Sequence, residues 1–309
     1  VFLLVFTGID RLFFRGANSN STFESSALSI LSYHVFRNFV LYTFVILLVS
    51  YKSKNKYRAM LIIALCCFAI CCFPTGLSRY MIAAFYLGVL IQYIRKEKCN
   101  TLFFLLIFAG VVIVFPALDV IRYLNKGFSI GEVASSIPKL ISNAYLSGNF
   151  DAYQMIISGT HYINQYGYSY GYQVLGVLLF FIPRSIWPNK PIGTGELVIK
   201  QLNQFEFSNV SMSLLGESYF NFGYVGIIIV GIVLGYVIKR VDDNYWNDDD
   251  VFSFRNITYP VLMFYFFFMQ RGDLLSTGSY FIANYVMGYL VWKLMVSKQS
   301  MSLVEVRKG

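Results

Sequence analysis

The residues best suited to chemistry lie in segment 180–195, which reads F-F-I-P-R-S-I-W-P-N-K-P-I-G-T-G. Arg184 and Lys190 stand here among prolines and near Trp187, beside apolar runs. Proline fixes φ and donates no backbone hydrogen bond, so we expect no continuous helix through this segment. Irregular backbone at membrane depth is stable only where protein or a wet cavity surrounds it. The pattern indicates an anion site; an interfacial turn with a snorkelling arginine is an equal alternative.

Three more arginines, Arg37, Arg79 and Arg271, lie inside or beside apolar runs. Ionisable groups in such places are costly unless they are paired, hydrated or functional. In the topology derived below, all three face the outer half of the membrane. Together with Arg184 they would form a cationic cavity for a phosphate or pyrophosphate, because guanidinium donor pairs match phosphate oxygens. For each arginine alone, snorkelling or a local ion pair such as Arg271–Asp273 is the alternative.

A carboxylate suited to act as a base stands at position 217. Glu217 lies in G-E-S-Y-F-N-F-G, residues 216–223, at the start of an apolar run. A carboxylate partly withdrawn from water there is suited to accept a proton. We therefore expect Glu217 to be the catalytic base, with Asp273 and Asp151 as further candidates. A structural carboxylate that interacts with a helix N-terminus is an equal alternative for Glu217.

No set of metal ligands stands out on the outer side, so we expect neither a metal nor a cofactor. Cys66, Cys67, Cys71 and Cys72 lie in an apolar run without His or carboxylate neighbours. This setting is typical of thiols that behave as small hydrophobic side chains. The aspartates within residues 242–250 fit a solvated loop on the opposite side better than a metal site.

Composition places the chain among polytopic membrane proteins. Of its 309 residues, 57% are hydrophobic, 18% aromatic and only 13% charged. The mean hydropathy is +0.57. This leaves too little polar surface to cover a soluble globule. The net charge of +9 does not indicate nucleic-acid binding, because the basic residues lie mainly in short loops between apolar runs.

We expect an all-α fold, a transmembrane helical bundle that forms one integral membrane domain over residues 1–309. The apolar run Val1–Ile9 is shorter than the roughly 20 residues of a spanning helix, so we expect it to be the end of a helix that begins upstream. The predicted spans are Ile30–Tyr51, Met60–Phe73, Tyr80–Ile94, Thr101–Leu118, Tyr219–Ile238, Ile257–Met269 and Ser279–Val296.

Four groups of basic residues set the orientation, because lysine and arginine in short loops mark the cytoplasmic side. The groups are Lys52, Lys54, Lys56 and Arg58; Arg95, Lys96 and Lys98; Lys239, Arg240 and Arg255; and Lys298, Arg307 and Lys308. All four groups lie on the cytoplasmic side if residues 119–217 form one large outer segment and Tyr172–Ile182 does not cross the membrane. This outer segment contains Y-G-Y-S-Y-G-Y at 166–172. Tyrosines with amide side chains suit sugars, although tyrosines also anchor proteins at membrane interfaces.

The chain resembles a known family on several of these strings. The proline-rich segment 180–195, G-N-F-D-A-Y at 148–153, G-E-S-Y-F-N-F-G at 216–223 and R-G-D at 271–273 are similar to those of Wzy-type polymerases. These enzymes polymerise the oligosaccharide repeat units of O-antigen and capsule polysaccharides. The resemblance covers most of the chain from Arg79 onwards, and the proline-rich motif is its most specific part.

The resemblance implies an inner-membrane glycosyltransferase with a GT-C-like bundle and an active site on the periplasmic face. Its substrates would be undecaprenyl-pyrophosphate-linked oligosaccharides, and a chain-length regulator would be a further partner. The growing glycan would leave one lipid carrier and join the next unit. Arg184, Arg79, Arg271, Lys190 and Arg37 would bind pyrophosphate or glycan, together with Trp187 and Tyr219.

Two other functions remain open at this stage. A lipid-linked oligosaccharide flippase would also bind pyrophosphate, but it should carry charges along a path across the bilayer. An O-antigen ligase would be expected to use an outer histidine, for which His161 is the loop candidate.

Overall fold

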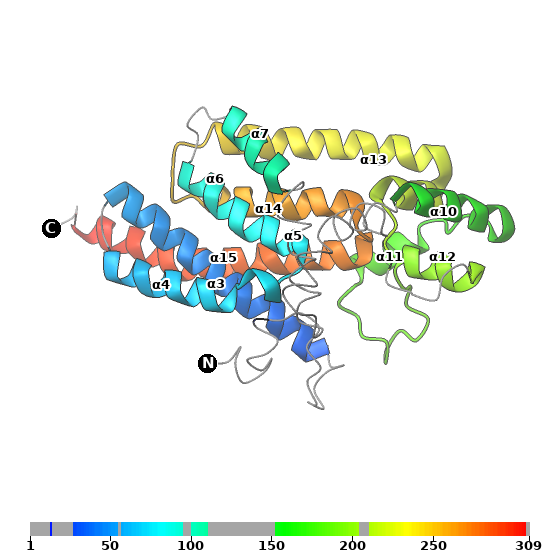
Figure 1. Cartoon of the computed structure of the whole chain (residues 1–309), viewed down its shortest axis with the longest axis horizontal. Helices are drawn as coiled ribbons and strands as arrows, with labels where there is room; N and C mark the ends of the chain where they lie inside the picture. The colour runs from blue at the N-terminus through cyan, green and yellow to red at the C-terminus, as the bar shows by residue number, and fades with distance from the viewer. Residues whose placement is uncertain are drawn as a thin grey trace, which may run out of the picture. The chain divides into compact units, whose positions relative to one another are not determined.

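The computed structural model describes residues 13, 27–54, 57–94, 100–110, 152–203 and 210–306 (Figure 1). Every regular element within these ranges is a helix, which confirms the predicted all-α class. The helices are α3 (Ala27–Lys54), α4 (Arg58–Cys71), η1 (Pro74–Gly76), α5 (Arg79–Ile82), the π-helix η2 (Ala83–Leu87), α6 (Gly88–Ile94), α7 (Asn100–Ala109), α10 (Ala152–Tyr166), α11 (Tyr172–Leu178), α12 (Thr194–Leu202), α13 (Leu214–Trp246), α14 (Phe254–Arg271) and α15 (Leu274–Val306).

The chain divides into two compact units. The first contains Val1–Ala144, Tyr245–Phe264 and Ala283–Gly309, and the second contains Tyr145–Asn244 and Tyr265–Ile282. Helices α14 and α15 contribute residues to both units. The expectation of one integral membrane domain, and that of a GT-C-like arrangement, stay predictions.

Buried polar contacts join helices within the first unit. Asn284 of α15 accepts a hydrogen bond from the Tyr42 hydroxyl, and its amide donates to Asn38 Oδ1 at 2.9 Å. Asn38 and Tyr42 both belong to α3, and all three side chains are buried. Phe44 of α3 stacks on Phe68 of α4 with ring centroids 5.1 Å apart. A buried polar chain whose members are all satisfied fixes the register of the helices that it joins.

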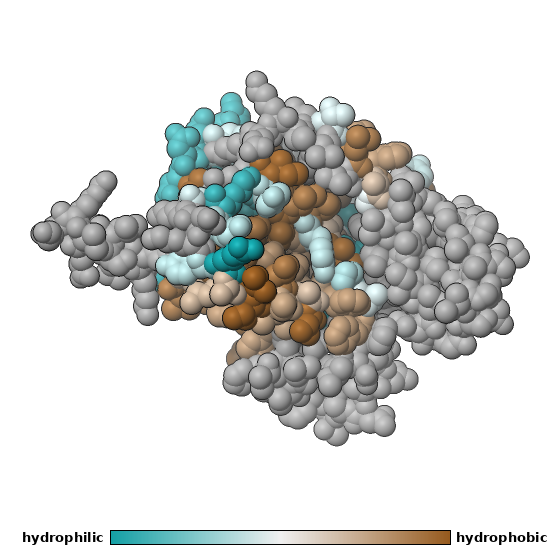
Figure 2. Space-filling view, turned by 60° about the vertical axis from the view of Figure 1, so that its left-hand side comes forward, coloured by the Kyte–Doolittle hydropathy of each residue, from teal (hydrophilic) through white to brown (hydrophobic). Residues whose placement is uncertain are grey.

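Among the helices that the structure describes, two are long and apolar enough to cross a membrane: the part of α3 from His34 to Ser53, and α13. Apolar side chains along α13 are largely exposed, with Ile232 at 68% and Ile228 at 61%. A row of exposed apolar side chains is costly in water and suits contact with lipid. Figure 2 shows hydrophobic side chains over much of the coloured surface.

The other predicted spans correspond to helices wherever the structure describes them. Helix α4 and the run α5–η2–α6 are shorter apolar helices, and α14 and α15 contain the last two predicted spans. Thr101–Leu118 is described only to residue 110. Helix α11 has 7 residues and so rises about 10 Å, too little to cross a core of about 30 Å. The sidedness of the loops stays a prediction.

The hydrophobic core of the second unit holds the segments that carry the candidate site. Met212 belongs to this core and packs closely against α10 and α13. A Cβ built on Gly159 of α10 would stand 2.8 Å from the Met212 side chain, and one built on Gly216 of α13 would stand 2.5 Å from it. The other buried members of this core are Met155, Ile163, Val198, Ile199, Val210 and Phe220. Segment 179–193 contains no helix, which confirms the expectation from its prolines.

Candidate active site

Two buried carboxyl groups meet in the second unit. Glu217 belongs to the first turn of α13, and Asp273 lies between α14 and α15; their exposed fractions are 2% and 6%. The two side chains lie within hydrogen-bonding reach of each other. Since a carboxylate cannot donate, a hydrogen bond between them needs a proton on one of the two groups. A pair that shares one proton holds a single negative charge and can accept one more proton.

Backbone amides support each carboxyl of this pair. Leu274 N donates to Glu217 Oε1 at 2.7 Å, and Gly195 N donates to Asp273 Oδ1 at 3.2 Å. Burial raises the pKa of Asp273, while its interaction with Glu217 and with the backbone of Gly195, Met212 and Thr194 opposes part of that rise. The pair is thus held in place by the start of α12 and the start of α15.

The glycines of the P-I-G-T-G string allow this approach. A Cβ on Gly193 would stand 1.7 Å from Asp273 Oδ2, so no larger residue fits there without moving the carboxylate. A Cβ on Gly195 would stand 2.4 Å from the Val210 carbonyl oxygen. Between them, the Thr194 side chain lies within hydrogen-bonding reach of Glu217. The sequence analysis did not predict a role for any of these three residues. Two glycines shortly after the prolines of segment 180–195 were the signal that could have indicated one.

Arg184 and Lys190 brace the proline-rich loop. The guanidinium donates to the carbonyls of Lys190 at 2.8 Å and Pro191 at 3.2 Å. The Lys190 ammonium donates to the carbonyls of Phe180 at 2.5 Å and Ile182 at 2.9 Å. Its pKa is lowered by burial and by the Arg184 charge. A guanidinium has five N–H donors, so Arg184, which is exposed, retains donors for a ligand.

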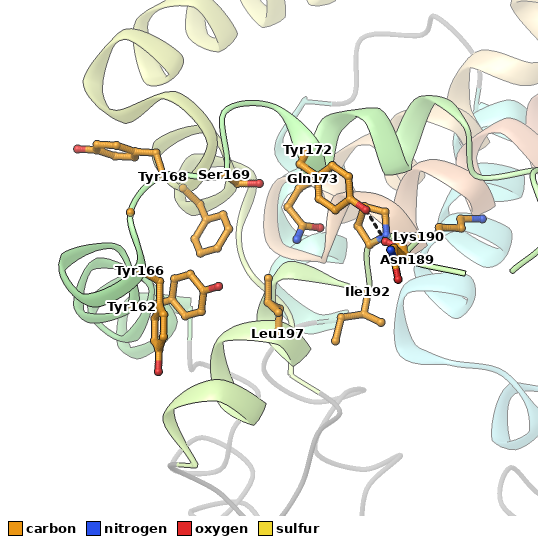
Figure 3. A pocket seen from close by; sticks show the side chains of 13 residues that line it. Tyr162, Tyr166, Tyr168, Ser169, Tyr172, Gln173, Asn189, Lys190, Ile192 and Leu197 are labelled. Carbon is orange, nitrogen blue, oxygen red and sulfur yellow. Dashed lines mark hydrogen bonds between the residues drawn. The ribbon is translucent and has the colours of Figure 1, made fainter. Parts of the chain in front are cut away.

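A cavity of about 370 Å³ lies beside this loop and is rich in tyrosine (Figure 3). Its wall includes Tyr162, Tyr166, Tyr168, Tyr172, Gln173, Asn189 and Lys190. Trp187 packs edge-on against Tyr172, with centroids 6.0 Å apart. Tyr219 lies 6.0 Å from Tyr168 and 5.2 Å from Tyr224 in edge-to-face geometry. The two predicted aromatic residues therefore belong to the ring clusters around the cavity.

The remaining predicted residues are spread over the chain. Arg37 and Arg79 belong to the first unit, and Arg184 and Arg271 to the second. Arg37 is fully buried and donates to the Gly76 carbonyl at 3.1 Å. Arg271 ends α14 and is exposed. The convergence of the four arginines stays a prediction.

Asp151 lies outside the described residues, so its candidacy as a base stays a prediction. His161 is exposed on α10, where its Nε2 lies 3.0 Å from Gln165 Nε2. Within the described ranges, no group of three or more His, Cys, Asp or Glu side chains is placed to hold a metal ion.

Comparison with known proteins gives one match. A family model described as O-antigen polysaccharide polymerase Wzy matches residues 1–301. No curated protein matches the chain, and no solved structure does.

Proposed function

Because the chain belongs to the O-antigen polysaccharide polymerase Wzy family, a family of membrane proteins that polymerise O-antigen repeat units, we propose that it transfers the growing glycan from undecaprenyl pyrophosphate to the next lipid-linked unit. The reaction takes place on the periplasmic face of the inner membrane. Residues 119–217 form the large outer segment in which the substrates meet.

The bond changes define what the site must supply. A hydroxyl oxygen of the acceptor sugar forms a bond to the anomeric carbon of the donor glycan, and the bond from that carbon to the pyrophosphate oxygen breaks. The hydroxyl proton must go to a base, and the leaving pyrophosphate must be stabilised. The enzyme therefore needs a proton acceptor on one side and cations on the other.

The Glu217–Asp273 pair is the proton acceptor in this proposal. Its single negative charge leaves room for one proton, and backbone amides of Gly195 and Leu274 hold both carboxyls in place. The proton that the pair already shares stays with Asp273, so that Glu217 is ionised and takes the proton of the hydroxyl; Asp273 also holds Glu217 in the required orientation. The observation that carries the assignment is this pair of buried, neighbouring carboxyl groups beside the P-I-G-T-G string.

Cationic side chains stabilise the leaving group in place of a metal ion. Arg184 and Lys190 are the first candidates because the loop holds them beside a cavity whose wall includes Lys190. Arg271, Arg79 and Arg37 are the further candidates. A guanidinium matches the oxygens of a phosphate with two parallel donors and needs no metal for that purpose.

The product formed from one purified lipid-linked repeat unit tests this function. Polymerisation gives a ladder of lengths that differ by one unit, and it persists in EDTA if no metal takes part. A single transfer to lipid A would instead show a ligase, and movement of the substrate without a new bond would show a transporter. Either of these outcomes would overturn the proposal.

A further inference from the structure

Gln173 is a buried amide without a partner. Its exposed fraction is 4%, it lines the tyrosine-rich cavity, and its side-chain amide makes no hydrogen bond within the described part of the chain. Figure 3 shows its side chain directed into the cavity from α11. A buried polar side chain usually finds a partner, because an unmade hydrogen bond is costly. A polar ligand in the cavity would supply that partner.

The tyrosines around Gln173 are held in place by the backbone of Y-G-Y-S-Y-G-Y. Gly167, Tyr170 and Gly171 have φ values of 84°, 47° and 85°, so the chain reverses direction within this string. Ser169 N donates to the Phe220 carbonyl at 3.0 Å, which fastens the loop to α13. The Tyr172 hydroxyl donates to the Asn189 carbonyl across the cavity rim (Figure 3). A wall that is ordered before binding loses little entropy when a ligand enters.

The chemistry of this wall fits a sugar ring. It combines aromatic faces with amides of Gln173 and Asn189, and none of its residues carries a carboxylate. Aromatic rings stack on the C–H face of a pyranose, and amides bind its hydroxyls. The volume of about 370 Å³ lies in the usual range for small-ligand sites. The Lys190 ammonium has three donors, two of which bind loop carbonyls, so the cavity wall offers mainly uncharged groups and suits an uncharged ring.

We propose that this cavity binds an uncharged pyranose of the repeat-unit glycan, and that Gln173 is its main hydrogen-bonding residue. The inference rests on the proposed function, because it identifies the cavity as a glycan subsite of the polymerase. The cavity then fixes the sugar next to the proline-rich loop, and Gln173 contributes to the choice of repeat unit.

Binding of the free glycan tests the subsite separately from catalysis. The probe is the native repeat-unit oligosaccharide, released by mild acid from the lipid-linked intermediate of the producing cell. We expect saturation-transfer NMR to show binding to the purified wild-type protein in detergent. Gln173→Met, which keeps the length of the side chain and removes the amide, should weaken that binding about tenfold or more. Its melting temperature should stay close to that of the wild type, because the amide faces the cavity and makes no side-chain hydrogen bond that the change would remove.

Gln201→Met is the matched control, because Gln201 is exposed on α12 and does not line the cavity. It should bind the oligosaccharide as the wild type does. Equal binding by Gln173→Met, or no binding by the wild type at millimolar oligosaccharide, would overturn the subsite. A wild type that binds the probe but makes no ladder from lipid-linked units would leave the subsite in place and contradict the proposed function.

Discussion

At the scale of single residues, the site depends on a glycine that has no chemistry of its own. Gly193 brings the backbone so close to Asp273 that an added Cβ would stand 1.7 Å from the carboxylate oxygen. Its importance follows from a tertiary contact between segments 80 positions apart in the chain. The sequence singled out the arginine and the prolines of the motif, whereas the structure adds the glycines that support the carboxyl pair.

Gly193→Ala should therefore impair both folding and catalysis. The new methyl group must displace Asp273 or the loop, and overpacking of this kind costs about 1–3 kcal/mol. We expect a lower melting temperature in detergent and a strong loss of polymerisation. Gly231→Ala is the control, because nothing lies within 4 Å of a Cβ built on that residue of α13. Wild-type activity in Gly193→Ala would show that the contact with Asp273 is unimportant.

The Arg184 side chain has two roles, one in the structure of its loop and one in the proposed function. Its guanidinium bonds to two carbonyls of its own loop, and in the proposed function it also binds pyrophosphate. Arg184→Lys keeps the charge but loses the planar pair of donors. The loss of one hydrogen bond from a charged group costs about 1.5–3 kcal/mol, or roughly 10- to 150-fold in kcat/KM.

The comparison for Arg184→Lys is Arg240→Lys, a change to an exposed arginine of α13 whose guanidinium bonds to the Tyr236 hydroxyl. Initial rates over a range of lipid-linked substrate concentrations give KM and kcat for both variants. Normal chain synthesis by well-expressed Arg184→Lys and Arg184→Ala would refute the assignment of Arg184.

At the scale of elements, apolar runs predicted where helices lie, because helices satisfy their own backbone groups in lipid. The predicted span Ile30–Tyr51 lies within α3, and Tyr219–Ile238 lies within α13. The sequence did not predict that α13 begins at Leu214, which places Glu217 inside its first turn. Nor could it predict the backbone break at Gly223, where φ is 63°. The start of a helix and a break inside it depend on contacts with residues distant in the sequence. Tyr168, for example, lies against Gly223.

The topology makes a prediction at this scale. In a variant without its native cysteines, Asn189→Cys should react with a membrane-impermeant maleimide added from the periplasmic side. Asp249→Cys, in the loop after α13, should react only after the membrane is permeabilised, because the basic residues near position 249 mark the cytoplasmic side. Both positions are exposed. Labelling of Asn189→Cys from the cytoplasmic side alone would contradict an outward-facing segment 119–217.

At the scale of the whole molecule, the chain forms two units, and the second contains both the polar site and nearly all of the apolar helix α13. The carboxyl pair, the braced cationic loop and the tyrosine-rich cavity all belong to residues 145–282 without the stretch 245–264. Composition and the basic loops predicted the membrane class and the location of this segment in sequence. They could not predict the pairing of Glu217 with Asp273, because hydrophobic periodicity holds no information on which distant polar groups meet.

The most direct test of the central claim is the rate of chain elongation by Glu217→Gln with purified lipid-linked repeat units. The change keeps the size of the side chain and removes its basicity, and general-base assistance is typically worth about 10²- to 10⁴-fold in rate. We predict that the folded variant binds substrate as the wild type does but elongates slower by a factor in that range. Elongation at close to the wild-type rate by a variant that binds normally would contradict the account and leave Glu217 with a structural role alone.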